Sequence, residues 1–355
     1  MAANTIAYGF VGLSELMAQR VADGNVEQVW KAIQDSAVEW SRQSTGLLSS
    51  LVERTTKYKA RIYLQGNGTL QPLDDNGSPL PVQPGSYYDV AYPIQGGGTA
   101  WGSNRVSRAL MTVDEANRNT VDALARDADW MRRHILAALF DNATWVFSDP
   151  KNGSLTIQPL ANGDTVEYLR TGGSAAVDTH QLAQAAAISD SADPFDDIYD
   201  ELMEHPSNSG PVVTYVPTNL TASIEALTAF IPVSDPEIIK GIGSDRLAAP
   251  IDRGFGDEVL GRVDRNWIVE WRALPSNYML AHAQGAGPVL AMREYEAPEI
   301  QGFFTERDAG DGNLQSVKMI RYAGFGVKNR VAAVVYRVGN GSYAIPPGYD
   351  APLAV

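Results

Sequence analysis

The sequence contains no cysteine, which excludes disulfide bonds and thiolate metal sites, so the fold must be held by packing and by partners. No apolar run approaches the roughly 20 residues that a membrane-spanning helix needs. The N-terminus has neither the basic flank nor the apolar core of a secretory signal. With 44 % hydrophobic and 20 % charged residues, the composition is that of a globular chain. We therefore expect that the protein is made in the cytoplasm and does not associate with a membrane.

Clustered basic residues are also missing. The formal net charge is −14, and residues 186–290 hold 16 Asp and Glu against 6 Lys and Arg. A protein that grips nucleic acid through its phosphates needs grouped Lys and Arg side chains. The simplest interpretation of the acidic region is a solvated surface, and specific nucleic-acid binding is not expected.

Motifs that carry catalysis are absent as well. There is no phosphate-binding glycine loop and no Gly-x-Ser-x-Gly nucleophile elbow. None of the four histidines is paired at metal-ligand spacing; they are His134, His180, His205 and His282. The sequence therefore predicts no catalytic, cofactor-binding or metal-binding residues.

One acidic cluster needs a separate test, because paired carboxylates can hydrolyse glycosides. Asp196, Asp200 and Glu204 share one face of a short helix, while Ile198 and Leu202 face elsewhere. The neighbouring Asp197 and Glu201 belong to the same cluster. This pattern is typical of the solvent side of an amphipathic helix, although an acidic β-rich hydrolase stays open as a distant alternative.

The N-terminal residues 14–51 show helical periodicity. Apolar side chains recur at helical spacing, namely Val26, Val29, Trp30, Ile33, Ala37 and Trp40. Two tryptophans on one stripe indicate that this helix is buried, against its own subunit or against a neighbour.

Residues 56–110 change to strand periodicity. Apolar residues alternate with polar ones from Tyr58 to Leu64, and a second extended run covers 87–94. Between them lies Asn76-Gly77, a strong two-residue turn signal, in a proline-rich tip. Gly96-Gly97-Gly98 is expected to end the second run. A long hairpin of this kind is marginal alone and needs a surface to lie on.

A capping box, Thr112-Val-Asp-Glu115, begins the longest expected helix. No Gly or Pro interrupts residues 113–145, which would form a rod of roughly 45 Å. Residues 179–290 then alternate between helical and strand patterns, which indicates a compact α/β unit. Strands return in residues 288–341, where Gly324-Phe-Gly326 is expected to break the chain before the last one.

This order of segments resembles the major capsid proteins of tailed bacteriophages, the Hong Kong 97 type. Asn219-Leu after a strand ending in Val-Pro is similar to the family's strand-to-helix step. Leu260-Gly-Arg-Val-Asp-Arg, with Ile268-Val-Glu and Leu274-Pro, resembles its axial-domain strands, and Arg321-Tyr-Ala-Gly-Phe-Gly-Val327 resembles its last strand pair. The resemblance covers roughly residues 50–340.

The resemblance implies an α+β chain with a Hong Kong 97-like capsid fold. By pattern, the parts are a helical N-terminal arm (1–55), an extended loop (56–110), a peripheral domain (111–179 and 286–341) with a spine helix (112–147), an axial domain (180–285) and a C-terminal tail (342–355). The candidate assembly contacts are Asp74, Asp75, Asn76 and Gly77 in the loop tip, Trp30 and Trp40 in the arm, and Lys240, Arg246 and Arg253 near the capsomer axis.

The implied function is structural: hexamers and pentamers of the chain would form an icosahedral virion shell around double-stranded DNA, which is enclosed without specific binding. The implied partners are other copies of the chain, a portal, and scaffold or decoration proteins, with synthesis in the host bacterial cytoplasm and no cofactor. Alternatives are an encapsulin-like compartment, which would enclose a protein, and a tail or baseplate protein.

Two departures from the family pattern matter. Some members join their subunits through a lysine in the extended loop, but no lysine occurs between Lys59 and Lys151 here. We therefore expect no isopeptide cross-linking, and a boiled denaturing gel should show single subunits without a ladder. Only some fifty residues precede the expected loop, which is too few for the scaffolding segment of about a hundred residues that many relatives carry, so a separate scaffold protein or none is expected.

Overall fold

A computed structural model describes residues 29, 31–39, 51–64, 73, 75–78, 87–101, 110–233, 258–307 and 317–353. The chain forms two compact units, each assembled from separate stretches of sequence. Unit 1 comprises 1–45, 95–132 and 295–323, and unit 2 comprises 46–94, 133–294 and 324–355. Both mix helices with sheet, so the architecture is α+β as expected.

Unit 1 is built on a three-stranded antiparallel arrangement. The first part of β17 (Val317–Val327) lies between β4 (Gln95–Trp101) and β16 (Phe303–Arg307). The 3-10 turn η2 (Pro298–Ile300) precedes β16. Residues 31–39 are helical, and their Ile33 and Ala37 enter the core of this unit, as the apolar periodicity predicted.

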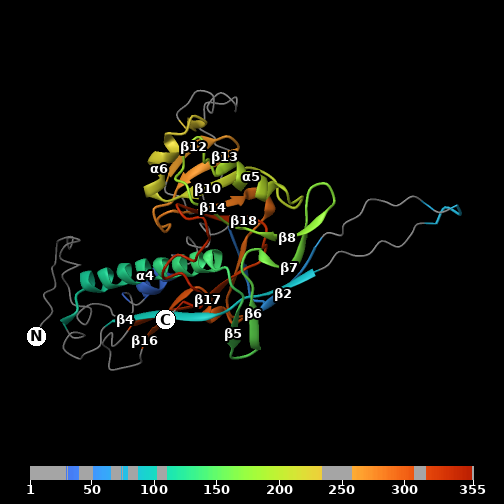
Figure 1. Cartoon of the computed structure of the whole chain (residues 1–355). Helices are drawn as coiled ribbons and strands as arrows, with labels where there is room; N and C mark the ends of the chain where they lie inside the picture. The colour runs from blue at the N-terminus through green and yellow to red at the C-terminus, as the bar shows by residue number, and fades with distance from the viewer. Residues whose placement is uncertain are drawn as a thin grey trace, which may run out of the picture. The chain divides into compact units, whose positions relative to one another are not determined.

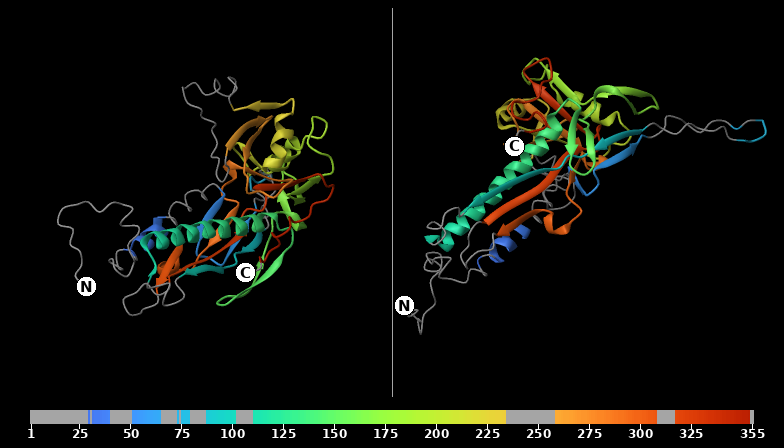
Figure 2. Two further views of the ribbon diagram at one scale, coloured as in Figure 1. Left: turned by 90° about the vertical axis from the view of Figure 1, so that its left-hand side faces the viewer. Right: turned by 90° about the horizontal axis from the view of Figure 1, so that it is seen from below.

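The helix α4 (Val113–Phe140) is a single uninterrupted ribbon in every view (Figures 1 and 2). It begins as predicted, because Thr112 Oγ1 accepts a hydrogen bond from the Glu115 N–H at 3.2 Å. It ends earlier than the predicted spine helix 112–147. Asp141 Oδ1 accepts the Ala143 N–H at 3.0 Å, a local turn that competes with helix continuation. A strand follows from Trp145.

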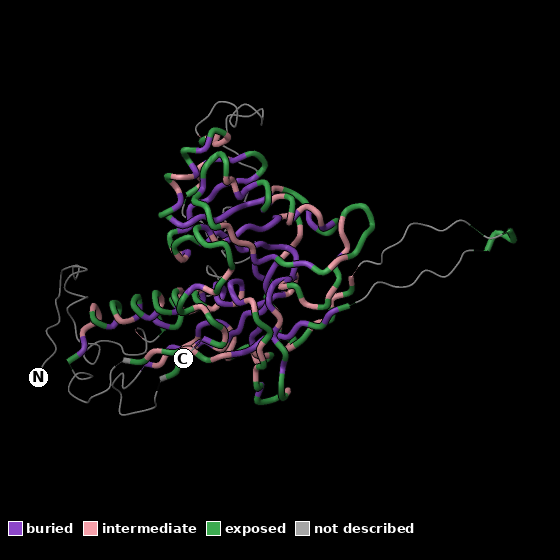
Figure 3. The backbone as a smooth tube through the Cα atoms, viewed as in Figure 1, coloured by how far each residue is buried: buried purple, intermediate pink, exposed green. Residues whose placement is uncertain are grey.

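The core of unit 2 is a seven-stranded sheet, whose four central strands are almost wholly buried (Figure 3). Two short helices pack on one face through Phe195, Ile198, Leu202, Leu220 and Ile224. The strand order is β11 (Phe230–Pro232), β12 (Glu258–Val263), β13 (Asn266–Glu270), β10 (Val212–Val216), β14 (Tyr278–Ala283), β18 (Ala333–Val338) and β9 (Gln181–Gln184), and the helices are α5 (Phe195–Met203) and α6 (Thr218–Glu225).

A hairpin stem projects from unit 2 in Figure 1. It pairs β2 (Lys59–Tyr63) with β3 (Tyr87–Ala91) in antiparallel register, so that Lys59 faces Ala91 and Tyr63 faces Tyr87. This confirms the predicted strands at the base of residues 56–110. The remaining elements of unit 2 are β1 (Val52–Thr55), β5 (Trp145–Asp149), β6 (Gly153–Ile157), β7 (Asn162–Leu169), β8 (Ala175–Thr179), β15 (Leu290–Arg293) and the 3-10 turn η1 (Gln284–Ala286).

Two glycine-rich segments lie inside strands, contrary to the breaks expected from sequence. Gly96, Gly97 and Gly98 belong to β4, where a Cβ on Gly97 would come within 2.8 Å of the Trp130 ring. Gly324 lies within β17, and a Cβ there would stand 2.0 Å from the Pro93 carbonyl oxygen. These glycines permit close approach rather than a bend.

Within the described part of the chain, no helix is both long enough and apolar enough to cross a membrane.

Candidate functional site

The sequence-derived assembly contacts are only partly visible. Asp75, Asn76 and Gly77 are exposed at the hairpin tip, and Gly77 has a φ of +76°, which fits the turn expected there. The other candidates lie outside the described residues; they are Trp30, Trp40, Asp74, Lys240, Arg246 and Arg253.

Aromatic side chains are exposed on the hairpin stem. Tyr63 and Tyr87 are 75 % and 53 % exposed, and their ring centroids are 6.3 Å apart. The Arg61 guanidinium lies 4.0 Å from the centroid of the Tyr87 ring and donates to both carboxylate oxygens of Asp89, at 2.7 and 2.9 Å. That hydrogen bonding lowers the pKa of Asp89. The stem thus presents a patch of rings and paired charges to solvent.

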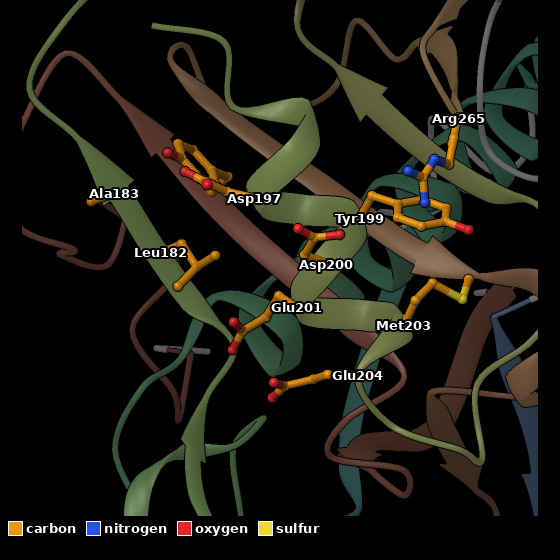
Figure 4. Close-up of a pocket in the computed structure, with 10 residues that line it drawn as sticks. Leu182, Ala183, Asp197, Tyr199, Asp200, Glu201, Met203, Glu204 and Arg265 are labelled. Atoms are coloured by element: carbon orange, nitrogen blue, oxygen red, sulfur yellow. The ribbon is translucent and has the colours of Figure 1, made fainter. Parts of the chain in front are cut away.

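A cavity of about 730 Å³ opens beside α5 (Figure 4). The helix contributes Asp197, Asp200, Glu201 and Tyr199 to its wall, and Arg265 stands opposite Tyr199, with its guanidinium carbon 4.6 Å from the ring centroid. The further lining residues are Leu182, Ala183, Met203, Glu204 and Tyr336. Acidic groups dominate this wall, so the cavity favours cations over anions.

At one end of this cavity the acidic helix meets a buried histidine pair. His180 Nε2 and His205 Nε2 are 3.1 Å apart, and Asp178 Oδ2 lies 2.9 Å from the second and 3.7 Å from the first. The three side chains are at most 3 % exposed. Asp178 comes from β8, His180 from the link to β9, and His205 follows α5.

Two glutamates from the end of α5 extend the cluster. Glu204 Oε1 lies 3.8 Å from His205 Nε2 and 3.1 Å from Arg170 Nη2. Glu201 interacts with the carboxylate of Asp178. Burial and then the neighbouring Asp178 raise the pKa of Glu201 to about 8 and that of Glu204 to about 7.

The pKa values of the two more deeply buried residues, Asp178 and His180, are lowered instead. Burial alone would raise the pKa of Asp178, but its side-chain interactions with His180, His205, Glu201 and Glu204 hold it far below its usual range. Burial lowers the pKa of His180, so this ring is neutral at pH 7.

The solvent exposure predicted for the acidic residues of α5 is correct only in part. Asp196, Asp197 and Asp200 are exposed as expected, but Glu204, expected on the same solvent face, turns inward with its side chain 25 % exposed. The pairing of His180 with His205 was missed. The only local signals were Asp178-Thr-His180, two residues apart at a strand end, and Glu204-His205 at a helix end.

No family model matches the sequence, and no curated protein matches it. Among solved structures, one of Mycobacterium phage Patience is similar over 99 % of both chains, with 19 % identity and a TM-score of 0.67. The capsid of Ralstonia phage GP4 (11 % identity, 84 % of this chain and 91 % of that chain, TM-score 0.47) and a structure of Mycobacterium phage Che8 (14 %, 94 % and 98 %, 0.42) are similar more loosely.

At TM-scores below 0.5 the last two likenesses support no argument, so the assignment of the fold rests on the first. The chain shares its mixed α+β fold with this phage structure, in agreement with the fold class that the resemblance of the sequence implied.

Proposed function

We propose that the chain is the shell subunit of a tailed bacteriophage, assembling as hexamers and pentamers into an icosahedral capsid that encloses double-stranded DNA. The observation that carries this proposal is the likeness to the Mycobacterium phage Patience structure, which spans 99 % of both chains. The protein would then act in the virion, after synthesis in the host cytoplasm.

The proposal includes the Hong Kong 97-type organisation. Residues 1–55 would form the N-terminal arm and 56–110 the extended loop. Residues 111–179 and 286–341 would form the peripheral domain around the spine helix, and 180–285 the axial domain. The hairpin stem β2–β3, the long α4 and six of the seven strands of the large sheet support this mapping, because they fall in the loop, spine and axial segments respectively. The seventh strand, β18, comes from the peripheral segment.

The exposed rings of the hairpin stem support assembly. Aromatic side chains are enriched at the centres of protein interfaces and are costly to leave in water. Tyr63 and Tyr87 share this stem, and Leu73 near the tip is 61 % exposed. A hairpin with little core of its own would gain stability by lying on a neighbouring subunit. The loop-tip contacts expected from sequence, Asp75 to Gly77 among them, would lie at the end of the same hairpin.

The acidic region supports a container that does not grip its contents. Residues 186–290 carry 10 more acidic than basic residues by sequence, and like charge weakens phosphate binding. We therefore expect packaged DNA to be enclosed without specific contacts. A portal and scaffold or decoration proteins would be the remaining partners.

The test is to express the chain alone, image it by negative-stain electron microscopy and measure its mass by light scattering. Closed shells, or stable five- and six-fold rings, are expected. Tubes would indicate a tail protein. A monomer or dimer that stays small at high concentration, with scaffold and portal proteins co-expressed, would contradict the shell proposal. The enclosed material distinguishes the two kinds of shell: a phage shell would hold nucleic acid, and an encapsulin-like compartment would hold a protein.

A double variant tests the hairpin separately. Tyr63→Ser with Tyr87→Ser should abolish or strongly reduce shell formation while leaving the thermal unfolding of the subunit nearly unchanged, because both rings are exposed in the single chain. Normal shells from this variant would remove the stem from the interface.

A further inference from the structure

We propose that Asp178, His180 and His205 bind a structural divalent transition-metal ion, for which Zn²⁺ is the best match, with a fourth ligand from solvent. The site lies entirely within unit 2, where β8, the link to β9 and the end of α5 meet. It is independent of the proposed shell function, since it rests on side-chain geometry and not on assembly.

The hydrogen bonds of the two rings fix where their lone pairs point. His180 Nδ1 lies 2.8 Å from the Ala333 carbonyl oxygen, and His205 Nδ1 lies 3.1 Å from that of Leu169. A carbonyl only accepts, so each Nδ1 carries its proton and donates it. In the neutral rings both Nε2 atoms are then bare acceptors. This is the arrangement of metal-ligating histidines, whose other nitrogen donates to a backbone carbonyl.

The acceptor atoms of Asp178, His180 and His205 lie close to one another. The Nε2 atoms of His180 and His205 are 3.1 Å apart and face Asp178 Oδ2. This oxygen is itself buried, with no hydrogen-bond partner among the described residues. Glu204 Oε1, a second buried oxygen nearby, is paired with Arg170 Nη2 at 3.1 Å. The three acceptors of Asp178, His180 and His205 lie within 3.7 Å of one another and repel unless a cation lies among them.

The spacing fits a tetrahedral ion. Ligand atoms about 2.0–2.1 Å from Zn²⁺ in tetrahedral geometry are roughly 3.3 Å from each other. The observed separations among Asp178, His180 and His205 are 2.9, 3.1 and 3.7 Å, and Glu204 Oε1 lies 3.8 Å from His205 Nε2. Asp178, His180 and His205 would supply three ligands, and a water molecule would complete four. Nitrogen and carboxylate donors in this geometry favour Zn²⁺ over Ca²⁺ or Mg²⁺.

The charge around the point also calls for a cation. Asp178, Glu201 and Glu204 bring three carboxyl groups together, and Arg170 supplies one positive charge at 3.4 Å from Asp178 Oδ1 and 3.1 Å from Glu204 Oε1. An ion can enter from the cavity beside α5, which Glu201 and Glu204 line.

The competing explanation is a proton in place of the metal. If His205 were doubly protonated, its Nε2–H would donate to Asp178 Oδ2 at 2.9 Å. That state would leave His180 Nε2 as an acceptor without a donor of its own, in the interior of the protein. A metal ion would give a partner to His180 Nε2, His205 Nε2 and Asp178 Oδ2, whereas the proton gives one only to the last two.

The test uses the full chain, stripped with a chelator, dialysed, and titrated with Zn²⁺. We expect one zinc per chain by elemental analysis, a rise in the unfolding temperature that the chelator reverses, and the intense visible absorption of tetrahedral Co²⁺ when cobalt replaces zinc. His205→Gln should weaken zinc binding by more than about 100-fold, since even outer-shell changes cost 10–100-fold. His134→Gln, a matched change in α4, should bind normally.

The cobalt spectrum keeps the test sharp if His205→Gln folds poorly, because it is read on the unmodified chain. No bound metal, no response of the unfolding temperature to Zn²⁺ and no tetrahedral cobalt bands would overturn the proposal in favour of the protonated pair. Equal zinc binding by His205→Gln and by the unmodified chain would also overturn it.

Discussion

Arg321 and Asp127 form a bidentate ion pair inside unit 1, with Nε and Nη2 donating to the two carboxylate oxygens at 2.6 and 2.8 Å. Both side chains are at most 3 % exposed. The pair joins β17 to α4 within that unit. A buried pair of this kind is a stringent structural requirement, because removing either partner leaves an uncompensated charge in the interior.

The first prediction concerns this pair. Arg321→Met should lower the free energy of unfolding by about 3–5 kcal/mol, since Asp127 would stay buried without its cation. Arg126→Met is the matched control, on the same helix as Asp127. The side chains of Arg126 and Asp122 form an exposed ion pair (66 % and 61 % exposed), which should contribute at most about 1 kcal/mol. Urea unfolding of the subunit measures both. Similar losses for the two variants would contradict the expectation.

A second prediction concerns Arg330, whose side chain is fully buried. Its guanidinium donates to the Pro159 and Leu160 carbonyls, to Asn162 Oδ1 and to Asp164 Oδ2 at 2.8, 3.2, 3.1 and 2.7 Å. Lysine cannot reproduce this planar fork, so Arg330→Lys should cost about 3–5 kcal/mol despite keeping the charge.

Arg337→Lys is the control for that change, because Arg337 makes a single hydrogen bond to an exposed carbonyl, that of Ser342. Its unfolding temperature should fall by much less. If Arg330→Lys and Arg337→Lys unfold at the same temperature, the fork geometry is irrelevant.

The third prediction compares two glycines. Gly324→Ala places a Cβ 2.0 Å from the Pro93 carbonyl oxygen, so the strand must move and the subunit should be strongly destabilised or fail to fold. Gly77→Ala meets nothing within 4 Å and costs only the strain of its positive φ, about 1–2 kcal/mol at an exposed tip. Soluble yield and unfolding temperature distinguish the two. Equal tolerance at both positions would contradict the close approach.

The fourth prediction concerns acid stability. Asp149 is buried, which alone would raise its pKa, but the Arg293 guanidinium at 2.7 Å and the backbone N–H groups of Lys151 and Asn152 hold its pKa below the usual range. A depressed carboxyl pKa contributes stability that is complete above the unfolded-state value near 4 and is lost as the pH falls towards the folded-state value.

Asp149→Asn should therefore be much less stable than the unmodified chain at pH 7, and the difference should shrink as the pH falls below about 4. The measurement is the urea midpoint as a function of pH. Asp122→Asn, a change at an exposed carboxylate, should lower the stability at pH 7 only slightly. A gap for Asp149→Asn that stays constant down to pH 2 would remove Arg293 as the cause of the depressed pKa.

Local patterns account for what the sequence predicted well. The alternation around Ile62 and the buried run ending at Val216 specify their strands through near neighbours, and Thr112 marks the helix start by its own side chain. The hairpins β5–β6 and β7–β8 were not identified, although Asn152-Gly153 is a turn signal, because short half-exposed strands have weak periodicity.

Long-range packing accounts for what sequence could not reach. Gly324 is interpretable only once Pro93 is known to lie against it, more than two hundred residues away in the chain. The cluster of His180 and His205 forms because β8 and α5 meet, and no spacing rule encodes that meeting. Burial of Glu204 likewise follows from its neighbours and not from its place on the helix.

The position of β18 has a consequence for the order of synthesis. This strand comes near the end of the chain, yet it lies between β14 and β9 in the seven-stranded sheet. Until residues 333–338 have left the ribosome, β9 has no place in that sheet, and the carbonyl of Ala333 is not there to orient His180. The nascent chain therefore cannot complete unit 2 early, and a subunit competent to associate should exist only after its release.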